Sequence, residues 1–286
     1  MIKIAVILTV YNRREVTLKG LRTLYKAIEY LQKEQPNEGY RFDIYMTDDG
    51  STDGTGEAVK TEFPNVHISQ GDGNLYWNGG MRKAWQTAIE TGEKYDFYLW
   101  YNDDVNIYDF SLSRLMKDSR SFNNMCIVVG ATSLSDGVTL SYGGRIKGKI
   151  PPCEGSVHKV DYFNGNIVLI PQVVFEQLGN LDSYYTHSKG DFDYGLRAKK
   201  AGITMIQCGD VLGVCELHPS LSAWCNPQIP LSARWAHMVK PNGMPPKESF
   251  YFNRRHFGLW SGIKVFCLIH LRCLFPFLWL ILKKSK

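Results

Sequence analysis

Carboxylates gather at two places in this 286-residue chain where a predicted strand ends. Asp48 and Asp49 close one apolar run, and Asp103 and Asp104 close another at residues 96–101. Adjacent ionised carboxylates repel each other, and a divalent cation between them relieves that repulsion. Because hard oxygen ligands suit Mg²⁺ or Mn²⁺ better than zinc, the second pair predicts a magnesium or manganese site. A helix cap, which needs a single acid, is the alternative interpretation of either pair.

A glycine pair lies between Gly73 and Lys83, where a helix is predicted to begin at about residue 78. Gly79 and Gly80 would expose backbone N–H groups at the positive end of that helix, with Arg82 in its first turn. Such a helix start suits a diphosphate, whereas a glycine-rich loop that only needs a positive φ is the alternative. The spacing matches neither a P-loop nor a dinucleotide fingerprint.

Two further acids, Asp191 and Asp193, open a predicted helix at about 191–201. The helix dipole favours an acid there in any protein, but a carboxylate that faces a binding crevice could also act as a general base. His218 follows another strand-like run. A neutral imidazole there could complete an oxygen-rich metal shell, although a lone histidine is more often structural.

Strands alternate with helices through the first hundred residues. The predicted strands are 2–10, 42–47, 66–69 and 96–101, and the predicted helices are about 14–34, 54–62 and 78–91. This alternation predicts βαβ units in an open, mostly parallel α/β sheet with helices on both faces. Ligands of such sheets bind outside the carboxyl ends of the strands. The loops that begin at Tyr11, Asp48 and Asn102 should therefore meet in one crevice.

The pattern changes after about residue 120. Strand-like runs at 125–130, 138–143 and 157–170 predict a mixed or antiparallel extension, and a helix is expected near 171–178. Residues 219–247 carry six prolines and predict a loop with one short helix. Because no linker divides the body, we expect one catalytic domain and a C-terminal appendage. The expected divisions are a nucleotide-binding half at 1–120, an acceptor half at 121–250 and a C-terminal segment at 251–286.

The composition excludes several classes of protein. Seven Trp, 16 Tyr and 14 Phe are too many for a disordered chain. Seven scattered cysteines with no C-x-x-C pair predict reduced thiols in a cytosolic protein, and the first strand does not resemble a signal peptide. The net charge of +5 equals the five basic residues from Lys264 onward, where there is no acid. A nucleic-acid partner is not expected, because its binding face would be basic through the body of the chain.

Residues 258–282 are mostly apolar and precede two lysines. The 18 residues that begin at Val265 would extend about 27 Å as a helix, barely enough to cross hydrocarbon. Three residues make spanning worse: His270, Arg272 and Pro276. We therefore expect an apolar C-terminal helix in the membrane interface, with Trp260 and Trp279 at headgroup depth. A buried helix that closes the domain or forms a dimer contact is the alternative.

Taken in order, these motifs resemble glycosyltransferase family 2. The similarity begins at Ile7–Arg13, continues through Asp48–Thr55 and Asn102–Asp104, and ends at Gly190–Asp193 and His218. It thus extends over most of the chain and leaves out the C-terminal segment, and the loop at 73–82 is similar to the rhamnosyltransferase-like branch. The resemblance implies the A-type fold of nucleotide-diphospho-sugar transferases.

The resemblance also implies a role for each matching residue. The nucleotide sugar would be bound by Thr9, Tyr11, Asn12, Asp49, Gly79, Gly80, Arg82 and Asp103. Tyr11 would stack on the base, and Asp103 would contact the ribose or the donor sugar. Asp104 and His218 would hold Mg²⁺ or Mn²⁺ on the diphosphate, and Asp191 would deprotonate the acceptor. Asn102 replaces the first acid of the family's D-x-D triplet, and Gly190 replaces the acid that usually precedes the base, so Asp193 stays open as the base.

The implied reaction is an inverting transfer from a UDP- or dTDP-sugar to a hydroxyl of a lipid-linked or polysaccharide acceptor. The enzyme would build surface polysaccharide at the cytoplasmic face of the inner or plasma membrane, held there peripherally by its C-terminal segment. One alternative is a sugar-1-phosphate nucleotidyltransferase, which would need a glycine-rich basic loop directly after the first strand. The other is a membrane-tethered nucleotide-sugar binder without catalysis.

Overall fold

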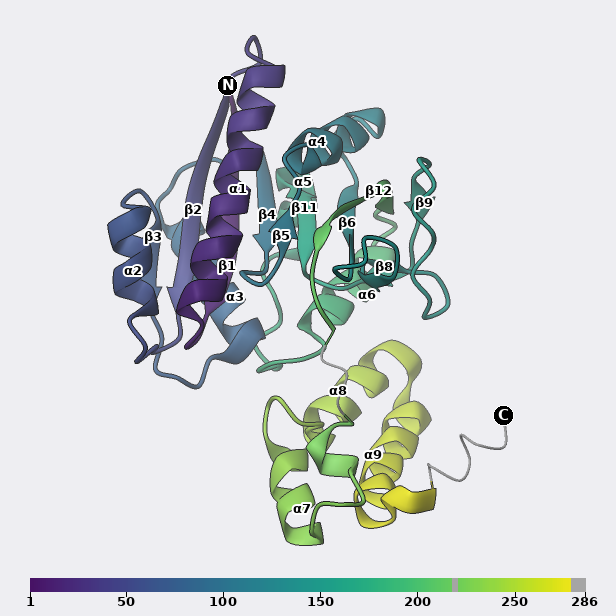
Figure 1. The fold of residues 1–286 in the computed structure, drawn as a ribbon. Coiled ribbons are helices and arrows are strands. Elements are labelled where there is room, and N and C mark those ends of the chain that lie inside the picture. Colours follow the sequence, from purple (N-terminus) through teal and green to yellow (C-terminus); the bar gives the residue numbers. More distant parts are fainter. Residues whose placement is uncertain (218–220, 279–286) are drawn as a thin grey trace. The chain divides into compact units, whose positions relative to one another are not determined.

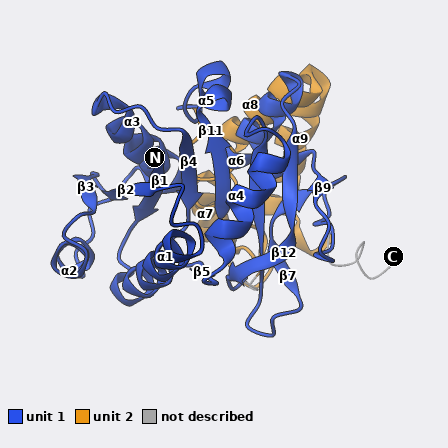
Figure 2. Ribbon diagram, turned by 90° about the horizontal axis from the view of Figure 1, so that it is seen from above, with its two compact units in different colours: residues 1–183, 190–217 blue, residues 184–189, 218–286 orange. Residues whose placement is uncertain are grey.

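The computed structural model describes residues 1–217 and 221–278, which form two compact units (Figure 2). The first unit comprises residues 1–183 and 190–217, and the second comprises residues 184–189 and the chain from 218. The predicted domain boundary at residue 250 therefore lies inside the second unit.

Parallel strands form one half of the main sheet (Figure 1). Their order is β3 (His67–Gln70), β2 (Tyr40–Asp48), β1 (Ile2–Val10) and β4 (Phe97–Tyr101). β1 pairs in register with β2 from Ile2 opposite Tyr40 to Val10 opposite Asp48. The interior residues of β1 are buried on both faces, which explains why this strand is a continuous apolar run.

The other half of the sheet is mixed. β11 (Ile167–Pro171) is antiparallel to both β4 and β6 (Ile127–Ser133), and β12 (Met205–Val214) is parallel to β6. The short strands are β5 (Asn106–Ile107), β7 (Leu140–Tyr142) and β9 (His158–Lys159) in the main sheet, with β8 (Gly144–Arg145) and β10 (Tyr162–Phe163) as a separate pair. The predicted mixed extension is confirmed.

Helices cover both faces of the sheet, as the A-type fold requires (Figure 1). One face packs against α1 (Arg14–Glu34), α2 (Thr55–Glu62) and α4 (Ser111–Ser121). The opposite face packs against α3 (Tyr76–Glu90), α5 (Gln172–Leu178) and α6 (Gly190–Lys200). The predicted fold class, an open and mostly parallel sheet between two helical layers, is confirmed.

The second unit is helical. It contains a 3₁₀ turn at Ala223–Cys225, then α7 (Leu231–Val239), α8 (Pro246–Phe257) and α9 (Leu259–Leu274). Prolines precede α7 and open α8, because a helix start tolerates their missing N–H. Buried Arg234 donates to the carbonyls of Cys273 and Leu274 and so caps the end of α9.

The predicted apolar C-terminal helix is present as α9 and stops at Leu274. Among the described residues, none of the helices combines the length and the apolar character needed to cross a membrane. All seven cysteines are free thiols, as their scattered positions predicted.

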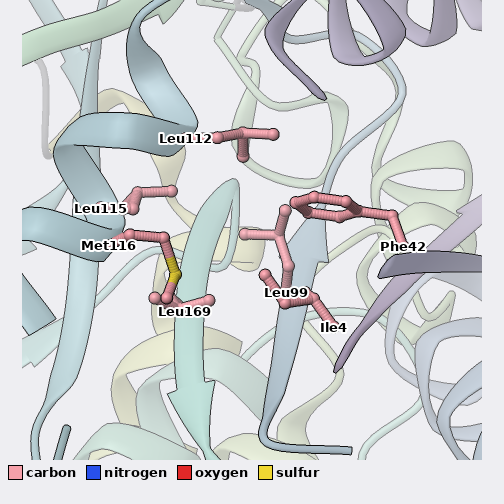
Figure 3. A pocket seen from close by; sticks show the side chains of 7 residues that line it. All are labelled: Ile4, Phe42, Leu99, Leu112, Leu115, Met116 and Leu169. Carbon is pink, nitrogen blue, oxygen red and sulfur yellow. The ribbon is translucent and has the colours of Figure 1, made fainter. Parts of the chain in front are cut away.

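The apolar layer between the sheet and α4 is closely packed. A cavity of about 10 Å³ remains there, and a space of this size holds no ligand (Figure 3). It is lined by Ile4, Phe42, Leu99, Leu112, Leu115, Met116 and Leu169.

This packing makes Leu99, which is 1% exposed, a position where truncation should enlarge an existing void. We expect Leu99→Ala to lower the free energy of unfolding by about 2–5 kcal/mol. Urea denaturation followed by circular dichroism measures the loss. Val138→Ala is the matched control, because Val138 is 80% exposed. Equal stability of the two variants would show that Leu99 contributes no packing energy to this layer.

Candidate active site

The loops that follow β1, β2 and β4 meet at the carboxyl edge of the parallel strands, as the alternation of elements predicted. Asn12 links the first two loops. Its N–H donates to Ser51 Oγ at 2.9 Å, and its Oδ1 accepts from the Thr52 N–H at 2.7 Å. Asn12 has a φ of 49°, a conformation that asparagine adopts more readily than most residues. The side chain of the preceding Tyr11 is 53% exposed beside this link.

Asp49 organises the next segment. Its buried carboxylate accepts N–H groups from Gly73 at 3.0 Å, Leu75 at 3.2 Å and Tyr76 at 2.9 Å. Asp49 therefore occupies the positive end of α3, where free N–H groups are otherwise unpaired. The capping interpretation of this acid holds, but the capped helix is α3 rather than the helix that directly follows β2.

The glycine pair lies inside α3, because the helix begins at Tyr76 rather than at residue 78. Gly79 already donates its N–H to Leu75 O at 3.1 Å, so the structure does not present it as a bare helix start. Gly80 allows α3 to approach β1, since a Cβ there would lie 2.0 Å from Thr9 Oγ1. Arg82 donates to the Leu181 carbonyl at 3.1 Å.

The paired acids after β4 have different surroundings. Asp103 is buried, and its carboxylate accepts from Thr17 Oγ1 at 2.7 Å and from Arg13 Nη1 at 2.8 Å. Burial outweighs these two partners and raises the pKa of Asp103 to about 6. Arg13 also contacts Asp104 Oδ2 at 3.3 Å. A guanidinium therefore lies against both carboxylates, a partner that the sequence motif did not reveal.

Asp104 is the more accessible of the two acids, with 31% of its side chain exposed. Its Oδ1 lies 3.7 Å from the Cys215 thiol at the end of β12, and burial raises the pKa of that thiol to about 12. His218 lies outside the described residues. Within the described ranges, His, Cys, Asp and Glu form no group of three that could hold a metal ion.

Trp77 connects β4 to the start of α6. Its indole N–H donates to Asn102 Oδ1 at 2.8 Å, and Asn102 in turn donates its N–H to Asn166 O at 3.0 Å. A Cβ on Gly165 would lie 2.6 Å from the Trp77 ring and 3.3 Å from the Cβ of Asp191. The indole, the glycine and Asp191 therefore pack against one another at the edge where β4 ends. Residues 162–166, which include Gly165, were expected from the sequence to line the sugar pocket, with a buried strand as the alternative, whereas sequence spacing gave Trp77 no role.

Asp191 and Asp193 are clearly different in the structure. Asp191 is mostly buried and accepts from the N–H groups of Gly165 at 3.1 Å and Phe192 at 2.8 Å. Burial outweighs those two bonds and raises the pKa of Asp191 to about 6. Asp193 is fully buried and pairs with Arg197 at 2.8 Å.

The chain is similar to a known protein family in sequence and to solved structures in fold. The model of a family described as glycosyl transferase family 2 matches residues 5–153, just over half of the chain. No curated protein sequence shows significant similarity to this chain.

Solved structures of similar fold include TarS 1-349 of S. aureus, with 17% identity and a TM-score of 0.50 over 75% of this chain and 60% of that chain. TarS 1-349 in complex with UDP-GlcNAc has 15% identity and a TM-score of 0.52, over 90% of this chain and 73% of that chain. The mannosyltransferase PcManGT from Pyrobaculum calidifontis was solved in complex with GDP-Man and Mn²⁺. It has 16% identity and a TM-score of 0.54, over 92% of this chain and 73% of that chain. At these identities the similarity establishes the fold, and in the first alignment the chain spans only 60% of TarS 1-349.

Removing the Asp49 carboxylate should release the segment that it holds. We expect Asp49→Ala to lower the free energy of unfolding by about 2–4 kcal/mol, because three backbone N–H groups lose their acceptor. Hydrogen exchange should become faster at residues 73–76, and urea denaturation measures the stability. Asp72→Ala is the control, since exposed Asp72 accepts the N–H of Asn74 rather than one of the three that Asp49 accepts, so exchange at residues 73, 75 and 76 should stay unchanged. Unchanged exchange at 73–76 would show that Asp49 does not fix this loop.

Proposed function

Because this chain belongs to glycosyltransferase family 2, we propose that it transfers a sugar from a nucleotide-diphosphate donor to an acceptor hydroxyl with inversion of the anomeric carbon. One observation carries the proposal. A carboxylate with a raised pKa, Asp191, packs through Gly165 and Trp77 against the end of β4, where the family's acidic triplet falls. Donor and base would therefore meet at a single edge of the sheet.

The donor nucleotide would lie along the loops after β1 and β2. The exposed ring of Tyr11 is available to stack on a base, and Thr9 and Asn12 flank it at the end of β1. We propose that Asp49 acts there by holding the loop at 73–76, and that Asp103 acts by positioning Arg13. Arg13, rather than Arg82, would then be the cation nearest to the diphosphate. The diphosphate would also not depend on the backbone N–H groups of Gly79 and Gly80.

Asp104 is the residue that would hold a divalent cation. Its carboxylate is a hard oxygen ligand that is partly exposed, and Mg²⁺ commonly binds one or two carboxylates together with substrate phosphates and water. The donor set therefore fits Mg²⁺ or Mn²⁺, with His218 proposed from the sequence as a second ligand. When bound, such a cation stabilises negative charge on the leaving phosphate. Arg13 would also stabilise this charge from the side of Asp103.

Asp191 would act on the acceptor as the general base. Its oxygens are oriented by the N–H groups of Gly165 and Phe192, and the ionised carboxylate would take the proton of the incoming hydroxyl. Attack from the face opposite the leaving diphosphate inverts the anomeric carbon in one step, so no second catalytic carboxylate is needed. We assign this role to Asp191 rather than to Asp193, because the carboxylate of Asp193 is buried against Arg197.

The donor and the acceptor are proposed as classes of compound, and the location follows from the class of acceptor. We propose a UDP- or dTDP-sugar as donor, with hexosyl or rhamnosyl transfer, and a lipid-linked or polysaccharide acceptor in surface polysaccharide synthesis. The TarS structure that holds UDP-GlcNAc has a similar fold, which supports a UDP-sugar as the first donor to test. A lipid-linked acceptor would place the enzyme at the cytoplasmic face of the membrane, with peripheral contact through the C-terminal segment 251–286.

Asp191→Asn should lower turnover by about 10²–10⁴-fold and leave donor affinity nearly unchanged, because the base is lost while the donor site is intact. Calorimetry with UDP-, dTDP- and GDP-sugars measures binding and identifies the donor, and a radiolabelled-sugar assay measures transfer. Asp193→Asn is the comparison, and it should lower thermal stability more than turnover. Wild-type turnover in Asp191→Asn would remove Asp191 from the mechanism.

The pH dependence follows from the raised pKa of Asp191. A general base works in its ionised form, so kcat/KM should fall about tenfold per pH unit below pH 6 and level off above it. Rate measurements from pH 4.5 to 8 would show the inflection. Since Asp103 also has a pKa of about 6, Asp191→Glu serves as the control. An inflection that does not move in this variant belongs to another group.

Metal dependence can be tested at Asp104. Removal of divalent cations with EDTA should abolish transfer, and Mn²⁺ or Mg²⁺ should restore it. Asp104→Asn should raise the metal concentration for half-maximal rate at least about tenfold, since a neutral amide is a weaker ligand. Asp109→Asn, at an exposed acid nearby in the sequence, should leave the metal requirement unchanged. Full activity in EDTA would overturn the assignment of a metal.

A further inference from the structure

The two compact units carry opposite charges. The second unit, residues 184–189 and 218–286, contains a single acid, Glu248. Its basic residues are Lys189, Arg234, Lys240, Lys247, Arg254, Arg255, Lys264, Arg272, Lys283, Lys284 and Lys286. The formal charge of this unit is therefore +10, which leaves −5 for the first unit within the total of +5. This excess of positive charge is larger than the +5 of the segment from Lys264 onward, and its basic residues are distributed along the whole helical unit.

Helix α9 is apolar on its outer face as well as its inner face. Gly262, Ile269 and Cys273 are buried against the rest of the unit. The opposite side is formed by Trp260, Ile263, Lys264, Cys267, Leu271 and Leu274, all of them exposed. Trp260 is 81% exposed, the largest value among the apolar residues of this unit that the structure describes. At 100° per residue these positions form one continuous stripe, in which Lys264 is the only charged side chain.

Helix α7 extends this apolar surface. Leu231, Trp235 and Val239 recur every four residues on one side of the helix, and each is more than 40% exposed. The Trp235 ring lies 5.5 Å from the His270 ring of α9. The α7 stripe is therefore adjacent to α9, and the apolar surface belongs to the folded unit rather than to one segment of sequence.

Basic side chains accompany the apolar surface. Lys240 follows the end of α7, Lys247 lies in the first turn of α8, Arg254 lies in its last turn, and Lys264 lies within the α9 stripe. All four are exposed. Exposed tryptophan and leucine together with lysine, and an almost complete absence of acids, match a membrane surface with anionic headgroups. A second copy that presents the same unit would bring +10 against +10, so the charge disfavours a symmetric dimer through this surface.

We infer that the folded unit of α7, α8 and α9 docks on an anionic lipid surface. The α9 stripe and the α7 stripe would enter the interface, and the lysines and arginines would contact the headgroups. This inference builds on the membrane contact proposed above, extends it from the C-terminal segment to the whole helical unit, and requires negatively charged lipid.

Vesicle flotation of the purified full-length protein tests the inference. The vesicles contain phosphatidylcholine alone or phosphatidylcholine mixed with a minor fraction of phosphatidylglycerol. We expect the affinity for the anionic vesicles to be at least about tenfold higher, and to fall as NaCl rises from about 50 to about 500 mM. No donor or acceptor is present, so binding is measured independently of glycosyl transfer. Asp191→Asn protein should float like the wild type even if the proposed reaction fails.

Two pairs of variants separate the apolar and charged contributions. Trp260→Gln with Leu271→Gln should reduce vesicle binding at least about tenfold, whereas Met125→Gln with Val138→Gln, exposed in the first unit, should not. Changing Lys240, Lys247 and Lys264 to Gln should remove most of the preference for anionic lipid. The matched control changes exposed Lys26, Lys60 and Lys117 to Gln. Circular dichroism confirms that each variant is folded.

Other results would overturn the inference. Equal binding to neutral and anionic vesicles would show that charge does not select the surface. Light scattering supplies a second outcome. If the protein binds no vesicles but forms a dimer, and Trp260→Gln with Leu271→Gln converts that dimer to a monomer, the apolar surface belongs to a second copy of the chain. Loss of binding in the first-unit controls would place the contact elsewhere.

Discussion

The three hydrogen bonds that Asp49 accepts determine where α3 begins, and the rest of the site depends on that position. They fix the helix start at Tyr76, so that Trp77 lies in the first turn. From there the indole reaches Asn102 at the end of β4 and packs against Gly165 and Asp191. One buried carboxylate thereby sets the distance between the strand edge and the proposed base. Since these contacts join residues that are far apart in the sequence, they depend on the assembled sheet.

Hydrophobic periodicity predicted the parallel half of the fold well. β1 and α1 were predicted almost to the residue, because their apolar residues recur at strand and helix spacing over long windows. α4 was not predicted, since serine and charged residues make up most of its 11 positions and its packing comes from only a few apolar side chains. Two-residue strands such as β5 and β8 carry no period at all and exist only through their partners.

The sequence predicted which strand ends lie together at the candidate site better than it predicted the hydrogen bonds within that site. Acids at the ends of strands were expected to converge, because parallel strands end at one edge. The pairing of Asp103 with Arg13 and Thr17 could not be read from spacing, because these residues are about 90 positions apart and the relevant rotamers depend on burial. Likewise, a glycine pair in the sequence does not show whether its N–H groups are already used inside a helix. The proposal of Asp191 rather than Asp193 as the base depends on knowing which of the two Arg197 neutralises.

The charge division between the units has a consequence for the protein in solution. The sequence pI of about 8.7 describes an average that neither part of the molecule has. In dilute buffer, the positive part of one molecule and the negative part of another attract each other over a Debye length of roughly 30 Å at 0.01 M ionic strength. Self-association under those conditions would be a colloidal effect of charge patchiness rather than a specific assembly, and added salt would reverse it.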